Sequence, residues 1–527
     1  MLQKLLSTGA SLLRGEGLPA LARPQASAGY MQNERNPFFF SWRPALRDQR
    51  EDVRAAYLQA ASRAIDTIHN SGWISGAINQ AIASTMGSGL RLAAKPDFEA
   101  LGWDKEAADK WARATERRFE AWGKNPAECD AEGRQTLGQQ ARSVMQSYYS
   151  HGEAVALLPM INRPGSVTRT KVKLLPAHKL TQFSDGIRKF QGVTVDAWGM
   201  PISYQFLLRH QEIYEQLIDI RARDAAGRPQ VIHVFDGAAA QVRGITPLAS
   251  VLKIVRQYDQ LADATLTGAL IQAIFAATIQ SEAPTADILN ALQDDGEQGV
   301  GGGNLDGLLD AKAGWYDNTK IDLGRAGKIA HLFPGEKLEF HGSKTPNSTY
   351  EAFAKFLLRE IARGLGLTFE TVTGDYSGAT YSSVRMATSE LWPMILSRRE
   401  VIPGRFYQQV YEAWLEEEIE TGRSKFPGGI YAFIANRDAA SRADGRGPAK
   451  PQADDLKTQR AHEGYKRMGV ATDEQICADM GTDWEDIYEQ RAREKALREK
   501  LGLPEGDTLN TAADEALTNA LITDKAA

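Results

Sequence analysis

The chain has 527 residues, of which 43% are hydrophobic and 24% are charged, a composition typical of a globular protein with two or three domains. Its formal net charge is −5, from 67 acidic and 62 basic residues. Proteins that grip DNA by neutralising phosphates are usually basic, so any contact with DNA should be loose and nonspecific. The two cysteines, Cys129 and Cys477, lie far apart without metal-ligand spacing, which indicates a reducing compartment and argues against a disulfide scaffold or a zinc site.

Residues 1–49 have no regular pattern and are interpreted as a mobile N-terminal arm. The segment contains four prolines and an aromatic cluster, Phe38, Phe39, Phe40 and Trp42, through which the arm could dock. Its first residues lack both a long apolar run and a clear cleavage site, so they are not interpreted as a targeting peptide.

Residues 50–245 are predicted to form an α+β domain. Helical spacing of apolar residues predicts helices over 49–70, 73–86, 104–122 and 135–151. The period then shifts towards two, which predicts strands over 90–92, 153–158, 171–175, 192–196, 202–208 and 231–235, with a turn at 197–201.

Residues 246–281 are predicted to form one long helix. Thr246 can cap it, with Pro247 at its first position, and the pattern runs to Gln280, about 50 Å at 1.5 Å per residue. Such a length suits a spoke or stem. Residues 264–281 carry no charge, but their spaced Thr and Gln residues are too polar for a membrane span.

Residues 282–345 are the least predictable part. The glycine-rich stretch 297–307 has no Gly-Lys-Ser/Thr after it, so a flexible insertion is favoured over a P-loop, and short strands are predicted at 328–333 and 337–340. A second helix over 346–365 opens with a Ser348–Glu351 capping box, and Gly364 is its expected C-cap.

Residues 366–383 form a small, polar loop before a further helix, which is predicted to start near Ser382 or Ser383 and to kink at Pro393. The only charge between residues 371 and 383 is Asp375, which is expected to bond to backbone amides. Composition alone favours an ordinary surface connector; the alternative is a loop that projects into a lumen or onto a partner.

Residues 384–436 include an acidic helix over 405–421, whose charge run is expected to be a solvated face. Residues 437–455 resemble a linker. Three short helices are predicted over 456–468, 473–480 and 483–501, with capping boxes at Thr472–Gln475 and Thr482–Glu485 and an end at Gly502. The tail, 506–527, has no clear binding pattern.

Motifs of common enzymes are missing: G-x-S-x-G, H-E-x-x-H, Walker A and an acidic metal triad do not occur. His233, in an apolar strand, is expected to be a core histidine. His331 and His341 flank a turn, but nothing supplies further ligands. The sequence therefore predicts no catalytic residues, no cofactor and no metal.

Several segments together resemble the lambda-type portal proteins of tailed bacteriophages. The most specific is G-L-T-F-E-T-V-T-G-D-Y-S-G-A-T-Y-S-S-V-R, at 366–385, which matches that family's signature. The family's hairpin resembles G-V-T-V-D-A-W-G-M-P-I-S-Y at 192–204, and its next block resembles I-H-V-F and R-G-I-T-P-L within 232–248. The C-terminal helices are similar too, although R-A-D-G-R-G-P-A-K-P stands where the family commonly has a Trp and an "iDP".

The resemblance implies a mainly helical α+β subunit that assembles as a ring, usually of twelve. By position, the parts would be an arm (1–49), wing (50–245), stem helix (246–281), clip (282–345), second stem helix (346–365), tunnel loop (366–383), kinked helix and wing/crown connection (384–436), crown (437–505) and tail (506–527).

The implied function is a portal vertex through which double-stranded DNA is packaged and ejected. Its partners would be further copies of itself, the terminase large subunit, capsid and scaffold proteins, and head-completion or tail adaptor proteins, with no membrane; it would lie in the virion and, during assembly, in the host cytoplasm. Expected DNA-facing residues are Thr371, Thr373, Asp375, Tyr376, Ser377, Thr380 and Tyr381, and expected structural motif residues are Arg243, Gly244, Pro247, Ser382, Ser383 and Arg385. The alternatives are a hydrolase hidden in the α+β domain, or another head–tail connector ring protein, although those are usually much shorter.

Overall fold

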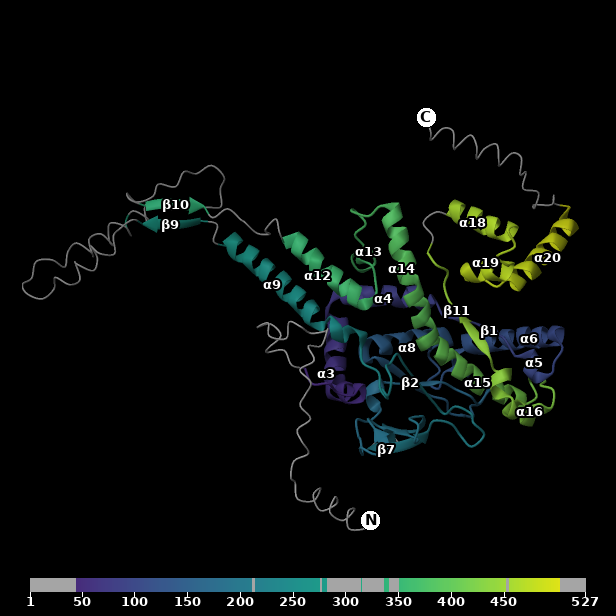
Figure 1. Ribbon diagram of the computed structural model, residues 1–527. Coiled ribbons are helices and arrows are strands. Elements are labelled where there is room, and N and C mark those ends of the chain that lie inside the picture. The colour runs from purple at the N-terminus through teal and green to yellow at the C-terminus, as the bar shows by residue number, and fades with distance from the viewer. Residues whose placement is uncertain are drawn as a thin grey trace, which may run out of the picture.

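The computed structural model describes residues 44–210, 214–274, 277–281, 314, 336–340, 350–451 and 455–502. Predictions made for the N-terminal arm, the glycine-rich stretch, His331, His341, the strand over 328–333, the Ser348 cap and the tail lie outside these residues. The described part is a mainly helical α+β body, from which two helices and a small strand pair project (Figure 1).

The body begins with helices, of which the four longer ones each bury an apolar face. They are α3 (Gln49–Asn70), α4 (Gly72–Met86), α5 (Phe98–Leu101), α6 (Lys105–Lys124), α7 (Pro126–Cys129) and α8 (Leu137–His151). Helices α3, α4, α6 and α8 are close to the predicted bounds, whereas the short helices α5 and α7 were not predicted. The caps agree with local chemistry: Asp104 accepts bonds from the first amides of α6, and Thr136 with Gln139 forms a capping box on α8.

Two antiparallel sheets follow. The first has the order β3-β2-β8, from β2 (Glu153–Leu157), β3 (Lys173–Leu175) and β8 (Val231–Phe235). The second has the order β4-β5-β6-β7, from β4 (Lys189–Phe190), β5 (Val193–Val195), β6 (Pro201–His210) and β7 (Tyr214–Arg221). Strand β7 was missed, and it pairs with β6 from Ser203↔Arg221 to His210↔Tyr214.

The first sheet separates two hydrophobic cores. Ala154 and Ala156 of β2 face the larger core, which the helices share, whereas Val155 between them faces the smaller core of the second sheet. This alternation follows from the two-residue period of a strand. Both faces are buried, so β2 reads as a continuous apolar run.

The predicted helix over 246–281 is wrong in its length. Thr246 does act as a cap, since its hydroxyl accepts a bond from Leu248 N, but the turn that follows is a 3-10 helix, η2 (Pro247–Ser250), and the α-helix α9 covers Leu252–Ile274. Residues Ala277–Ser281 form strand β9, paired with β10 (Glu336–Phe340) from Glu336↔Ser281 to Phe340↔Ala277. Pairing with a distant partner decides the conformation of β9, whose five residues, Ala-Thr-Ile-Gln-Ser, are too few to distinguish helix from strand by their spacing.

The second projecting helix, α12 (Tyr350–Leu365), lies beside α9 (Figure 1). Its C-cap is not Gly364: the left-handed residue is Gly366, with φ +67°. Gly364 remains in the helix, where an added Cβ would lie 2.2 Å from Val251 Cγ1. The absence of a side chain at Gly364 therefore permits close packing between α12 and the base of α9.

Helix α13 (Phe369–Thr373) and a short loop lead to α14 (Tyr381–Arg399), which contains Pro393. A π-helical segment, η3 (Glu400–Gly404), joins α14 to α15 (Arg405–Glu420). The expected solvated face of α15 is wrong, because Glu412, Glu417 and Glu418 are buried.

The predicted linker at 437–455 is wrong for part of its length. After α16 (Gly429–Ala435), it contains α17 (Arg437–Ala440) and β11 (Ala443–Arg446), which pairs with β1 (Arg91–Ala94). The C-terminal helices α18 (Asp455–Arg467), α19 (Asp473–Asp479) and α20 (Trp484–Leu501) agree with prediction, and Thr472 and Gly502 cap as expected. The cap of α20 is Asp483 rather than Thr482, since its carboxylate accepts bonds from Glu485 N and Asp486 N.

Candidate functional site

The loop between α12 and α14 is short because part of the predicted segment is helical. Thr368 caps α13 by accepting a bond from Thr371 N at 3.0 Å, and Gly374, with φ +68°, ends that helix. Thr380 then caps α14 through a reciprocal pair of bonds with Ser383. The segments without regular structure are therefore 366–368, before α13, and 374–380, after it.

Asp375 organises this loop. Its Oδ1 accepts bonds from Ser377 N at 3.0 Å and Ser377 Oγ at 2.6 Å, and its Oδ2 lies 3.3 Å from Lys355 Nζ of α12. The bond from the Ser377 hydroxyl, with help from the Ser377 amide and Lys355, lowers the pKa of Asp375 to about 2. The carboxylate is thus ionised at neutral pH and ties the loop to α12.

The expected DNA-facing residues differ in what they offer. Thr371 and Thr373 are half-buried and use their hydroxyls locally, and Asp375 is also half-buried. Tyr376, Ser377 and Thr380 are exposed, with Tyr376 57% exposed. Tyr381 is the first residue of α14, and its side chain lies outside the described part.

The motif residues at the start of α14 lie on its surface. Ser382, Ser383 and Arg385 are all exposed, and Ser383 contributes to the cap. Glu390, further along α14, pairs with Arg363 of α12 at 3.2 Å. Helices α12 and α14 are therefore joined both by the loop and by this ion pair.

Arg243 and Gly244 lie apart from the loop, in the body. Arg243 is fully buried and its Nε lies 2.8 Å from Glu153 Oε1, while Glu153 Oε2 accepts bonds from Gly244 N at 2.9 Å and His233 Nε2 at 3.0 Å. Tyr57 OH of α3 donates to Glu153 Oε1 at 2.7 Å. His233 is thus a core histidine, as the sequence predicts.

This buried network fixes the start of the projecting pair. Burial opposes ionisation of Glu153, but the Arg243 charge outweighs it and holds the pKa of the carboxyl well below its usual range. Gly244 is needed because an added Cβ would lie 2.1 Å from Gly152 O. Pro247, three residues on, opens η2 and hence leads into α9.

The chain is similar in sequence to known proteins. Residues 36–399 match the family of phage portal proteins described as the lambda family. The chain belongs to the lambda family of phage portal proteins. It is 26% identical over 475 residues to the portal protein of Escherichia phage N15 and 26% identical over 479 residues to portal protein B of Escherichia phage lambda, covering 88% of both chains in each case.

Solved structures that resemble this portal-family chain are more distant. The neck of an empty gene transfer agent particle has 13% identity and a TM-score of 0.42, with 84% of this chain and 96% of that chain covered. An HK97-family phage portal protein from Corynebacterium diphtheriae has 11% identity and a TM-score of 0.29, with 65% and 87% covered. Likeness at this level carries no argument about function.

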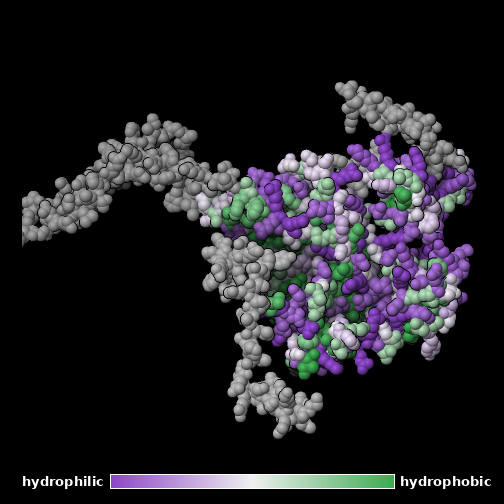
Figure 2. Space-filling view, viewed as in Figure 1, coloured by the Kyte–Doolittle hydropathy of each residue, from purple (hydrophilic) through white to green (hydrophobic). Residues whose placement is uncertain are grey.

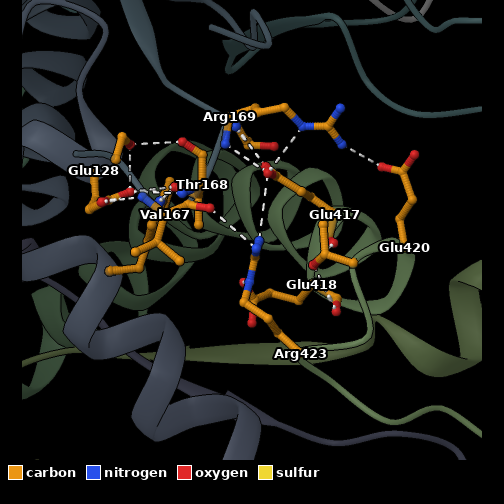
Figure 3. Close-up of polar contacts among 12 residues, drawn as sticks. Glu128, Val167, Thr168, Arg169, Glu417, Glu418, Glu420 and Arg423 are labelled. Carbon is orange, nitrogen blue, oxygen red and sulfur yellow. Dashed lines mark hydrogen bonds and ion pairs between the residues drawn. The ribbon is translucent and has the colours of Figure 1, made fainter. Parts of the chain in front are cut away.

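A second polar network of the portal-family chain joins α15 to the body (Figure 3). Glu417 accepts bonds from Arg169 N and Thr170 N, both at 2.7 Å, and Arg423 Nε bonds to Glu418 Oε1 at 2.6 Å. Burial disfavours the charge of Glu417, but these amide bonds and the Thr170 side chain hold its pKa below the usual range.

Glu128 of α7 clamps the other side of the same loop. Its carboxylate accepts bonds from Val167 N at 2.7 Å, Thr168 N at 3.0 Å and Thr168 Oγ1 at 2.8 Å (Figure 3). Burial acts against its ionisation, yet these bonds lower the pKa of Glu128 to about 2.

The acidic run of α15 was misread because its partners come from distant segments.

Neither network resembles a catalytic centre. Within the described ranges, no group of three or more His, Cys, Asp or Glu side chains is arranged to hold a metal ion. Cys129 and Cys477 are both free thiols. Of the helices that the structure describes, none is long and apolar enough to cross a membrane.

Proposed function

We propose that this chain is the subunit of a portal ring, through which double-stranded DNA enters and leaves a phage capsid. The observation that carries the proposal is the family match over 36–399, together with relatives that cover the chain almost end to end and are named portal proteins. The site then assigned to DNA is the exposed part of the loop at 374–380.

The geometry supports this assignment in two ways. The loop is tied down at both ends, by Asp375 to Lys355 and by Thr380 to α14, so it holds a fixed position while presenting Tyr376 and Ser377. Its exposed groups are uncharged, and the whole chain is net negative. Strong pairing with phosphates would hold DNA in place, whereas weak contacts let it slide.

The projecting helices favour assembly with further copies. Phe353 and Phe356 on α12 are 53% and 58% exposed, and Leu266 and Leu270 on α9 are 61% and 56% exposed. Apolar surface is visible at the exposed end of α12 (Figure 2). A neighbouring subunit in a closed ring would cover such residues on every copy.

The remaining roles follow from the family. The body would be the wing, α9 and α12 the stem, the segment between them the clip, and the C-terminal helices the crown. A terminase would dock on the ring during packaging, and head-completion or tail adaptor proteins would follow; capsid and scaffold proteins would surround it in the virion. The subunit itself would not be an enzyme, so the force would come from a separate ATPase.

The first test is the mass of the purified protein by native mass spectrometry and its outline by negative-stain imaging. A ring of about a dozen copies with a central hole is expected. A stable monomer or dimer, even with capsid and scaffold proteins present, would contradict the proposal.

The loop assignment has its own test. Replacing 374–379 with a shorter Gly-Ser linker keeps all of α13 and the Thr380 cap of α14, so rings should form while DNA packaging or retention falls. Trp198→Ala removes another exposed aromatic, on a body turn, and serves as the control. Normal packaging by the shortened loop would refute its role at the DNA.

A further inference from the structure

The C-terminal layer, α18–α20, is built differently from the rest of the subunit. None of the side chains described between residues 457 and 502 is buried, whereas α15 alone buries eleven residues. Its apolar side chains stay at the surface: Tyr465, Met468, Val470, Met480, Leu497 and Leu501 are each more than half exposed. Hydrophobic burial therefore contributes less to holding the layer on the body than it does within the body.

Ion pairs cross the junction instead. Arg113 of α6 pairs with Glu485 and, at 3.4 Å, with Glu489, and Arg117 pairs with Glu489 at 2.8 Å. Arg91 of β1 pairs with Asp486, and Arg446 of β11 pairs with Asp483. Arg446 also lies 3.4 Å from Glu474 of α19.

The strand pairing gives an independent reason for these contacts. Arg91 and Arg446 are direct partners in the antiparallel β1–β11 pair. Like charges opposite one another destabilise a strand pair. Here Asp486 and Asp483 of the layer each neutralise one of the two arginines, so the body positions a repulsive pair where the layer supplies acids.

The junction is also loosely packed. A cavity of about 640 Å³ lies between the two parts, lined by residues of α6 and β1 and by Asp483, Glu485 and Asp486. One close backbone approach occurs, where an added Cβ at Gly481 would lie 3.2 Å from Ala449 N. The surface around the junction is mostly hydrophilic (Figure 2).

We propose that these charges form an electrostatic latch, and that the C-terminal layer undocks as a unit from the body when the latch is screened or reversed. The latch consists of Arg91, Arg113, Arg117 and Arg446 on the body and Glu474, Asp483, Glu485, Asp486 and Glu489 on the layer. The docking surface is the arginine face of α6, β1 and β11, and its occupant is the acidic half of α20 with Glu474.

Salt should open the latch because most of its charges reach solvent. Side-chain exposure is 36% for Arg113, 63% for Arg117 and 41% for Glu489. Exposed pairs are weak one by one and are screened as the Debye length falls from about 10 Å at 0.1 M salt to about 3 Å at 1 M. Without the body, a layer that buries no side chain has little to hold its helices together.

Amide hydrogen exchange on the full-length protein tests this. We expect exchange in 473–501 to speed up about tenfold between roughly 50 mM and 1 M NaCl, while exchange in the buried helix α15 stays unchanged. Arg113→Glu combined with Arg117→Glu should give the same increase at low salt, because three attractions, Arg113 with Glu485 and Glu489 and Arg117 with Glu489, become repulsions.

Two further variants keep the test decisive. Adding Glu485→Arg and Glu489→Arg to the reversed pair restores opposite charges and should restore protection. Lys124→Glu reverses a single charge on α6, half the change of the double variant, at a lysine that bonds to Glu120 of its own helix, and should leave 473–501 unaffected. The latch would be refuted if exchange in 473–501 changed neither with salt nor with charge reversal, or if the restored charge pairs did not restore protection.

Discussion

Replacing Arg243 with methionine should destabilise the body more than almost any other single change to a charged residue. Arg243 bonds to both oxygens of Glu153, at 2.8 and 2.9 Å from Nε, and its Nη1 donates to the carbonyls of Gln191 at 3.0 Å and Thr181 at 3.2 Å. Methionine fills similar space but leaves Glu153 charged in a site with no exposed surface. Removing one partner of a buried ion pair costs about 3–5 kcal/mol of unfolding free energy.

The effect of pH has a definite sign. In the parent protein the folded-state pKa of Glu153 lies below its unfolded value of about 4.3, so its stabilising contribution is present above that pH and is lost as pH falls. Without the guanidinium, burial pushes the folded-state pKa of Glu153 upward. As pH falls, Glu153 therefore binds a proton at a higher pH in the folded variant than in the folded parent. The difference in unfolding free energy between the two proteins should narrow as pH falls from 7 to 5.

Urea denaturation, monitored by tryptophan fluorescence, measures both the loss of unfolding free energy and its dependence on pH. Arg54→Met, at an exposed arginine of the neighbouring helix α3, is the matched control and should change the unfolding free energy by less than about 0.5 kcal/mol. Adding Glu153→Gln to Arg243→Met should recover part of the loss, because the uncompensated charge is gone. A single-variant loss below about 1 kcal/mol, or a gap that widens at low pH, would refute the reasoning.

Other changes test the packing and the loop. Glu417→Gln should cost about 1–3 kcal/mol at pH 7 and make stability depend less on pH below about 4.3, because the lowered pKa of Glu417 makes its contribution fall with acid; urea denaturation at pH 7 and 4 checks this. Gly364→Val should raise amide exchange along α12, since its Cβ would lie 2.2 Å from Val251 Cγ1, whereas Gly268→Ala on α9, with no atom within 4 Å, should not. Asp375→Ala should leave the unfolding free energy unchanged while raising exchange within its own loop.

Local chemistry predicted much of the fold. Helix α3 and strand β8 have the predicted bounds, because apolar spacing and capping residues act within a few positions of the chain. The same holds for part of the loop: the bonds of Asp375 to Ser377 and of Thr380 to Ser383 join residues no more than three positions apart, whereas the contact of Asp375 with Lys355 joins distant positions. Its sequence could therefore indicate how the loop is held.

Two of the larger misreadings depend on distant partners. Strand β11 has the sequence Ala-Asp-Gly-Arg, which carries no strand signal, and it is extended only because it pairs with β1, 355 residues earlier at the Arg91↔Arg446 position. The burial of Glu417 depends on amides at 169 and 170. A run of acids looks solvated when the donors that bury it cannot be found by spacing.

The two arginine–carboxylate systems of this subunit should differ in their response to salt, because one is buried and the other is exposed. Arg243 and Glu153 have no exposed side-chain surface, so mobile ions cannot approach them and the body should keep its stability in concentrated salt. The pair Arg117–Glu489 is 63% and 41% exposed and should weaken. Raising salt should thus release the C-terminal layer while the body stays folded, and this order follows from the burial of each pair.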